Sequence, residues 1–248
     1  MVKQKAKGHQ KSMQQLENAM IQLKIQYSAE MLQTFKDYME LVLSWNQKVN
    51  LTAITDRDEF IKKHFIDSLI CAKEEEVEIA QTVIDVGTGA GFPGLPLAII
   101  YPEKQFLLID SLNKRVKILE EIYTNLNIKN VTVLHSRAEE AGQQKTYRER
   151  FDLCVSRAVA NLSTLSEYCL PFIKTNGYFL AYKGPDYESE LDVSKGAIAK
   201  LGGDVIAVKK AALTNFGLEH NIIYIKKIKK TPSNYPRKAG TPAKEPLK

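Results

Sequence analysis

The sequence predicts an α/β fold in which helices cover both faces of a mostly parallel, seven-stranded sheet. Between residues 82 and 201, apolar runs typical of strands alternate with stretches typical of amphipathic helices. The last two apolar runs, 204–209 and 221–228, are joined without a helix, so we expect an antiparallel hairpin at one edge of the sheet. A glycine-rich turn after the first strand predicts where this sheet meets a ligand.

Composition limits the class of protein. The 248 residues are 44% hydrophobic and carry a net charge of +6, which fits one medium-sized domain with extensions. No stretch approaches the ~18 consecutive apolar residues of a membrane span, and the Lys-rich start lacks the apolar region of a signal peptide. We therefore expect a cytoplasmic monomer without a membrane partner. The three cysteines lie at no metal-like spacing, so no metal is expected.

The residues before the sheet predict a helical extension. Apolar residues at helical spacing indicate one helix over 12–23, a second that begins after the N-cap Ser28, and a third over 56–71. His64 lies in the third helix, where a structural role is the commoner one. Four regions are predicted in all: a disordered basic tail (1–11), a helical cap (12–75), a sheet domain (76–230) and a basic arm (231–248).

The sheet domain alternates strictly between the two kinds of element, which gives parallel strands joined by right-handed crossovers. Strands are predicted at 82–86, 105–110, 130–135, 151–156 and 177–183. Helices are predicted near 93–101, 113–126, 137–147, 161–170 and 186–201.

The first predicted strand runs into D-V-G-T-G-A-G-F-P-G, from Asp85 to Gly94. Glycines allow positive φ and let a ligand approach the backbone without meeting a Cβ, and the helix that follows offers free N–H groups. The spacing of Gly89, Gly91 and Gly94 suits a dinucleotide. Asp85, however, repels a pyrophosphate and suits a cationic amino-acid group. A turn without any ligand is the third interpretation.

The turn D-x-G-x-G-x-G is typical of S-adenosylmethionine-dependent methyltransferases. Together with five parallel strands and a terminal hairpin, it favours a class I, Rossmann-like methyltransferase over a dehydrogenase. Asp110 ends the second strand, where its carboxylate would accept hydrogen bonds from ribose hydroxyls or cap a helix. Ala138 and Glu139 follow the third strand and are candidates to contact adenine, although acids are common in a first helical turn.

The ends of the fourth and fifth strands should face the methyl acceptor. They carry Arg157 and Lys183, our candidate catalytic residues, although Arg157 would also suit a structural ion pair. The sequence contains neither an Asn-Pro-Pro-Tyr motif for exocyclic amines nor the Pro-Cys pair of pyrimidine-C5 enzymes.

Positive charge is concentrated at the C-terminal end. From Lys226 to Lys248 there are eight Lys or Arg against one Glu, which indicates a polyanionic partner. We expect an arm that orders on RNA, with Arg237, Lys238 and Lys244 on phosphates and Tyr235 stacked on a base. A disordered tail is the alternative.

Five blocks occur in order: W-N-x-x-x-N-L-T (45–52), H-F-x-D-S (64–68), the glycine turn, S-R-A (156–158) and Y-P-R-x-x-G-x-P (235–242). From about Leu16 to Leu247 the chain resembles the glucose-inhibited division protein B family, the bacterial small-subunit ribosomal RNA guanine-N7 methyltransferases (RsmG). The resemblance implies S-adenosylmethionine as cofactor and 16S ribosomal RNA or the small ribosomal subunit as partner. It also implies family contacts at Gly87, Phe92, Ala138, Glu139 and Arg157. The predicted cofactor contacts are then Asp85, Gly87, Gly89, Gly91, Phe92, Asp110, Ala138, Glu139 and Arg157.

The implied acceptor, N7 of one guanine, has a free lone pair and no proton, so in-line transfer needs no general base. Two other classes remain open. An RNA-binding module could bind the donor without transferring, but the intact Asp85 and Asp110 argue against decay of the site. A Tyr-x-x-x-Lys or comparable hydride-site pair would support a nicotinamide oxidoreductase. The candidate tyrosines, Tyr178 and Tyr224, lie within predicted strands and so not at plausible catalytic places.

Overall fold

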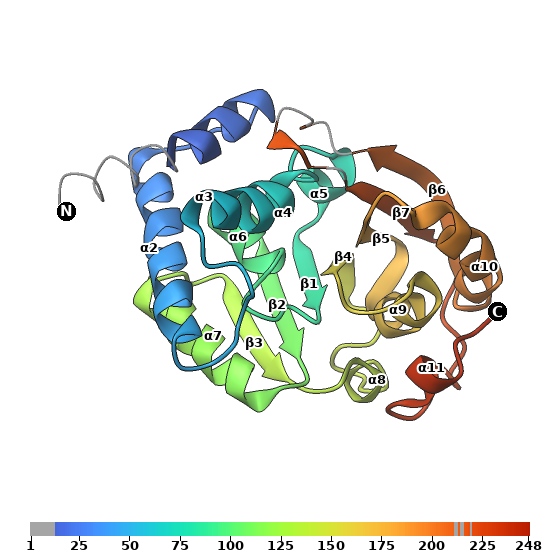
Figure 1. Cartoon of the computed structure of the whole chain (residues 1–248). Coiled ribbons are helices and arrows are strands. Elements are labelled where there is room, and N and C mark those ends of the chain that lie inside the picture. The colour runs from blue at the N-terminus through green and yellow to red at the C-terminus, as the bar shows by residue number, and fades with distance from the viewer. Residues whose placement is uncertain (1–12, 211–212, 214–215, 219) are drawn as a thin grey trace.

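The structure is a computed structural model that describes residues 13–210, 213, 216–218 and 220–248. Seven strands form one sheet in the order β3-β2-β1-β4-β5-β7-β6 (Figure 1). The five strands β1 to β5 are parallel, and β7 runs antiparallel to both β5 and β6, so the predicted sheet and hairpin are confirmed. The strands are β1 (Thr82–Val86), β2 (Gln105–Asp110), β3 (Val131–His135), β4 (Phe151–Arg157), β5 (Ile173–Lys183), β6 (Gly203–Lys210) and β7 (Asn221–Lys227).

Helices cover both faces of the sheet. Helices α6 and α7 pack on one face with α2 outside them, and α9 and α10 lie on the other (Figure 1). Residues 13–22 are also helical. The remaining helices are α2 (Ala29–Asn46), α3 (Arg57–Phe60), η1 (Ile61–Ile66), α4 (Asp67–Leu69), α5 (Glu75–Ile79), α6 (Gly94–Ile100), α7 (Asn113–Asn125), α8 (Ala138–Ala141), α9 (Leu162–Cys169), η2 (Leu170–Phe172), α10 (Tyr187–Lys200) and α11 (Thr241–Lys244).

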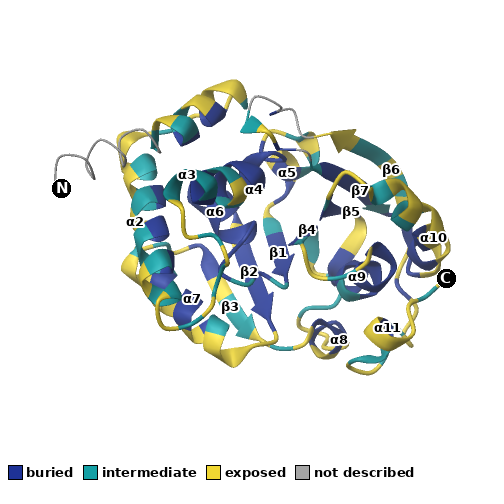
Figure 2. Ribbon diagram, in the orientation of Figure 1, coloured by how far each residue is buried: buried dark blue, intermediate teal, exposed yellow. Residues whose placement is uncertain are grey.

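The central strands are apolar on both sides because both faces are covered. Successive side chains point to opposite faces, so Val83 joins the hydrophobic cluster under α6 and α7 while Ile84 joins the cluster under α9. Figure 2 shows this burial along β1 and β2, with exposed residues on the outer sides of the helices. None of the described helices is both long enough and apolar enough to span a membrane.

Two predicted helices differ from those observed. The helix expected at 137–147 is only the single turn α8, because turns begin at Gly142. The helix expected at 56–71 is built from α3, the π-helix η1 and α4, joined without a break. π-Helical segments are rare in proteins, and those that occur are often found at functional sites. Segment η1 carries His64.

Residues 231–248 are folded against the body of the protein. Thr164 Oγ1 of α9 donates to the carbonyl of Pro242 at 3.0 Å, and Arg237 binds Glu167 of the same helix. The Gly240 N–H donates to Glu139 Oε1 of α8 at 2.8 Å. Two predictions for this segment are therefore wrong. It is neither an arm that becomes ordered on RNA nor a disordered tail, because it is already folded in the free protein.

Candidate active site

The glycine turn leaves β1 with its backbone in the left-handed region. Gly87, Gly89 and Gly91 have φ of +76°, +60° and +103°, which side chains with a Cβ rarely adopt. A Cβ built on Gly89 meets nothing within 4 Å, so the space beside this residue is open. A Cβ on Gly87 would collide with Val159, from the loop after β4. The turn therefore exposes backbone to a ligand at Gly89 and packs closely at Gly87.

Asp85 stabilises this turn through hydrogen bonds to two of its residues. Its side chain is 0% exposed, and Oδ2 accepts hydrogen bonds from Thr88 Oγ1 at 2.7 Å and the Gly94 N–H at 2.8 Å. The buried Oδ1 has no hydrogen-bond partner among the described residues. Burial raises the pKa of Asp85 to about 6. In this structure the carboxylate bonds the two ends of the turn, and its contact with a ligand stays a prediction.

A cavity of about 220 Å³ lies beside the turn at the ends of β1, β2 and β3. It brings together four of the predicted cofactor contacts: Gly87, Asp110, Ala138 and Glu139. Asp110 accepts from the Gly89 N–H at 2.9 Å and from the Leu112 N–H at 2.8 Å, one bond to each carboxylate oxygen. Each oxygen keeps a further lone pair that could accept from a hydroxyl.

Phe92 and Arg157 lie next to each other beyond the turn. The His64 ring stacks on Phe92 with centroids 4.4 Å apart and planes 5° apart, and the Arg157 guanidinium carbon lies 5.5 Å from the centroid of Phe92. Arg157 Nη2 lies 3.4 Å from His64 Nδ1, and His64 Nε2 lies 2.7 Å from Thr52 Oγ1. Burial and the charge of Arg157 lower the pKa of His64 to about 3, so this imidazole is neutral and both of its nitrogens are occupied.

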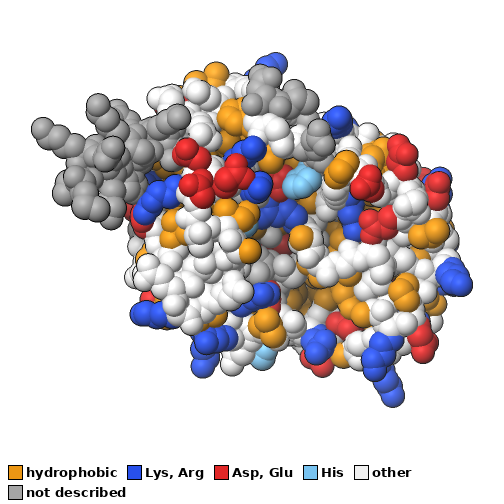
Figure 3. Space-filling model, in the orientation of Figure 1, with side chains coloured by type: hydrophobic (Ala, Val, Ile, Leu, Met, Phe, Trp, Pro, Cys, Tyr) orange, Lys and Arg blue, Asp and Glu red, His pale blue; other side chains and the backbone are white. Residues whose placement is uncertain are grey.

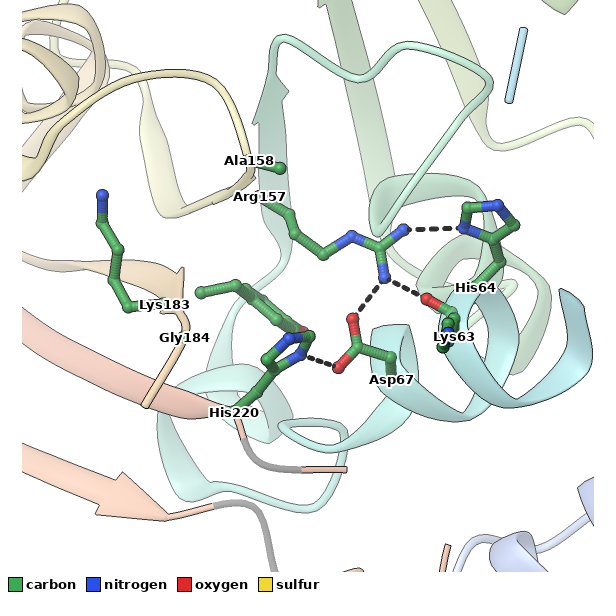
Figure 4. Close-up of a pocket in the computed structure, with 9 residues that line it drawn as sticks. Lys63, His64, Asp67, Arg157, Ala158, Lys183, Gly184 and His220 are labelled. Atoms are coloured by element: carbon green, nitrogen blue, oxygen red, sulfur yellow. Dashed lines mark hydrogen bonds and ion pairs between the residues drawn. The ribbon is translucent and has the colours of Figure 1, made fainter. Parts of the chain in front are cut away.

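Asp67 connects Arg157 to a residue from the other end of the chain. One of its oxygens binds Arg157 Nη1, and the other accepts from His220 Nδ1 (Figure 4). Arg157 Nη1 also donates to the carbonyl of Lys63 at 2.9 Å. The sequence prediction missed His220 and gave Asp67 no role. The H-F-x-D-S block was the signal for Asp67, whereas a single histidine before the last strand gave none for His220.

A second cavity, of about 340 Å³, lies between this cluster and the ends of β4 and β5. Figure 3 shows the face of the molecule hollowed near its centre, with Lys or Arg side chains and a histidine at the hollow. Lys183 Nζ donates to Glu190 Oε1 at 2.7 Å and to the carbonyl of Ala160 at 2.8 Å. The structure thus brings the two predicted catalytic residues to one cavity. Its lining is Lys63, His64, Asp67, Arg157, Ala158, Tyr182, Lys183, Gly184 and His220.

The four predicted RNA-binding residues line neither cavity. Arg237 donates from Nε and Nη2 to the buried Glu167, so its guanidinium is held in an ion pair. Tyr235 is half-buried against the body, while Lys238 and Lys244 are exposed. Among these four residues, only the two lysines are exposed.

The strand order, the glycine turn after β1 and the two cavities at the carboxyl edge define the class I, Rossmann-like fold of S-adenosylmethionine-dependent methyltransferases. TYW2 from M. jannaschii, solved in complex with AdoMet, has this fold, with a TM-score of 0.52 and 17% identity over 71% of this chain and 80% of that one. Ribosomal protein L11 methylase from Lactobacillus delbrueckii subsp. bulgaricus has a TM-score of 0.51 and 16% identity over 67% of this chain and 79% of that one.

Sequence comparison identifies the family within this class. The chain belongs to the family described as GidB, rRNA small subunit methyltransferase G, whose model matches residues 31–221. The ribosomal RNA small subunit methyltransferase G of Clostridium botulinum (strain Eklund 17B / Type B) is 50% identical over 224 residues, which are 90% of this chain and 94% of that protein. The predicted family is confirmed.

Proposed function

We propose that this protein transfers a methyl group from S-adenosylmethionine to N7 of a guanine in small-subunit ribosomal RNA. The observation that carries this proposal is the pair of cavities at one edge of the sheet. One collects predicted cofactor contacts and the other collects Arg157 and Lys183. The family description supports ribosomal RNA as the substrate.

The first cavity suits the proposed cofactor. Asp110 has lone pairs left for ribose hydroxyls, and the open backbone at Gly89 lets a ligand approach closely. The carboxylate of Asp85 supplies negative charge beneath the turn, which favours a cationic ligand over a pyrophosphate. When bound, S-adenosylmethionine supplies an electrophilic methyl group. Asp110, Ala138 and Glu139 are the residues we expect to hold its nucleoside part.

The second cavity suits an acceptor that carries no proton. Guanine N7 offers a lone pair, so no residue has to remove a proton during transfer. His64 is a poor base because its pKa is about 3, and Arg157 and Lys183 are held as donors in ion pairs. These residues therefore position the reactants in line. Orientation of this kind can lower the activation barrier by up to ~7–11 kcal/mol.

We also propose that Lys238 and Lys244 bind RNA phosphates and that Arg237 keeps them in place. The lysines are exposed at the surface of the folded C-terminal segment, and cations of this kind attract a polyanion. Arg237 is paired with Glu167, so its effect on RNA binding is indirect: it holds the C-terminal segment that carries the two lysines. Tyr235 remains our candidate for stacking on a base.

The test is methyl transfer from labelled S-adenosylmethionine to small-subunit ribosomal RNA, both free and in ribosomal particles, followed by identification of the labelled nucleoside. We expect N7-methylguanosine as the single labelled product. Thermal unfolding with S-adenosylmethionine or NAD is the control, since only a ligand of the native state raises Tm. Binding of the methyl donor without transfer to either RNA form would favour an RNA-binding module, and another labelled nucleoside would refute N7.

A further inference from the structure

His220 lies at the mouth of the second cavity in a defined orientation. Its side chain is 37% exposed, and its Nδ1 donates to Asp67. Nε2 makes no hydrogen bond to any residue that the structure describes. In Figure 4 the imidazole binds the Asp67 oxygen that Arg157 does not, and it lies on the side of Asp67 toward Gly184 and Lys183.

Asp67 fixes this orientation because it is itself immobilised. Its side chain is 1% exposed, and its second oxygen is bound by Arg157. A buried carboxylate with a donor on each oxygen cannot turn without leaving one of the two donors unpaired. The hydrogen bond that His220 donates to Asp67 outweighs burial and the repulsion of Arg157, and it raises the pKa of His220 above its ordinary value. His220 therefore keeps an N–H on both nitrogens to a higher pH than a free histidine does.

When the imidazole carries both protons, its Nε2–H is a donor at this cavity, and such a donor matches one edge of guanine. The edge that carries N7 also carries O6, and both atoms are hydrogen-bond acceptors. Adenine presents an amino group where guanine has O6. The acceptor base must leave N7 free for the methyl group, so O6 is the atom on this edge that can be bound. The Lys and Arg side chains that line the cavity have partners already. Lys183 binds Glu190, Lys63 binds Glu59, and the Nη atoms of Arg157 bind Asp67, the carbonyl of Lys63 and His64.

We propose that His220 is a positioning residue for the acceptor base, and that its Nε2–H donates to O6 of the target guanine. The proposal rests on the proposed function and deepens it, because it names the group that distinguishes guanine from adenine. Asp67 acts behind His220 by binding Nδ1, which leaves Nε2 for the base.

Three substitutions separate contact with the base from contact with Asp67. In His220→Asn the amide keeps a donor near the position of Nδ1 but cannot reach into the cavity. In His220→Gln the amide places a donor near the position of Nε2. We expect His220→Ala and His220→Asn to lower kcat/KM for the RNA about tenfold to a hundredfold, the usual range for removing a hydrogen bond that reads a base, and His220→Gln to recover part of it. Normal transfer by His220→Asn with a defect in His220→Gln would show that His220 only supports Asp67.

The decisive experiment also removes O6 from the acceptor. Small-subunit RNA is assembled by ligation with 2-aminopurine, which lacks O6, in place of the guanine that the unaltered protein methylates. Equilibrium binding and kcat/KM are then measured for the unaltered protein and for His220→Ala. We expect His220→Ala to be weaker than the unaltered protein on guanine RNA and equal to it on 2-aminopurine RNA, because the changed reactivity of N7 affects both proteins alike and cancels in their ratio.

The outcomes separate this inference from the proposed function. If His220→Ala loses the same factor on guanine RNA and on 2-aminopurine RNA, His220 does not bind O6 and the inference is wrong. If the unaltered protein makes no N7-methylguanosine on natural RNA, it is the proposed function that fails. S-Adenosylmethionine binding should be equal in the protein and its variants, since His220 does not line the first cavity.

Discussion

Arg157 is the residue on which the second cavity depends. It joins β4 to the helical extension through Asp67 and the carbonyl of Lys63, and it lies over the ring of Phe92. A planar guanidinium can make these contacts at once, whereas an ammonium group cannot reproduce them. The end of β4 and helix α4 are therefore held in one fixed relation beside the second cavity.

We expect Arg157→Ala to lower the rate of methyl transfer at saturating donor about 100-fold, because misplacement of about 1 Å has an effect of this size. Arg157→Lys should restore little of that rate. Single-turnover kinetics measure the effect, with thermal unfolding to confirm that both variants fold. Lys195→Ala, on an exposed ion pair of α10, is the matched control. A full rate in Arg157→Ala would show that the guanidinium has no part in positioning.

The raised pKa of Asp85 predicts that the free energy of unfolding depends on pH. Its folded-state pKa is raised by burial to about 6 from an ordinary 3.8. Between about pH 4 and pH 6 the folded state keeps a proton that the unfolded state releases. The free energy of unfolding should therefore fall as pH rises through this range, by about 3 kcal/mol from this group alone. Asp85→Asn removes that contribution while its carbonyl can still accept from Thr88 and Gly94.

The measurement for Asp85 is urea unfolding of the protein and of Asp85→Asn at several values between pH 4 and pH 7. The variant should gain stability relative to the unaltered protein as pH rises. Parallel profiles across this range would mean that Asp85 titrates as an ordinary exposed carboxylate.

At the scale of elements, the C-terminal segment depends on one ion pair with a buried member. Glu167 is 0% exposed and receives Arg237 from both Nε and Nη2. Arg237→Ala should lower the free energy of unfolding by about 3 kcal/mol, since an unpaired buried charge is costly. Adding Glu167→Gln should restore part of the loss, and urea unfolding measures both. No change in the single variant would show that the segment is held by its other contacts.

The lysines of the same segment should act on RNA and leave folding unchanged. Replacing Lys238 and Lys244 by Gln should weaken RNA binding and reduce the slope of log affinity against log salt concentration by about 1 for each phosphate that is no longer neutralised. Binding titrations at low and at near-physiological salt concentration measure the slope, with Lys195→Gln as the control. An unaltered slope would place the RNA on another surface.

The sequence predicted local structure well and distant contacts poorly. The glycine turn and the apolar strands are local patterns, so the sheet, the hairpin and the place of Gly87, Asp110, Ala138 and Glu139 at the strand ends were predicted from the sequence, and their contact with a cofactor stays a prediction. His220 and Asp67 are 153 residues apart and meet only because β7 returns beside β5. The fold of the C-terminal segment likewise depends on Glu167, 70 residues away from Arg237, and nothing in the basic composition of the segment reveals that partner.

At the scale of the whole molecule, the sheet domain lines both cavities and the helical extension lines only the second. The ends of β1, β2 and β3 surround the first cavity, whereas α4, β4, β5 and the residue before β7 surround the second. The loop after β4 borders both cavities, through Ala158 in one and Val159 in the other. This arrangement suits transfer between two ligands bound side by side.

The most direct test of this account is methyl transfer to small-subunit RNA transcribed with 7-deazaguanosine in place of guanosine. That base keeps O6 and its pairing edge but has a carbon at the position of N7. The account predicts that the modified RNA competes for binding and accepts no labelled methyl, while unmodified RNA accepts it. Equal incorporation into both RNAs would contradict transfer to N7.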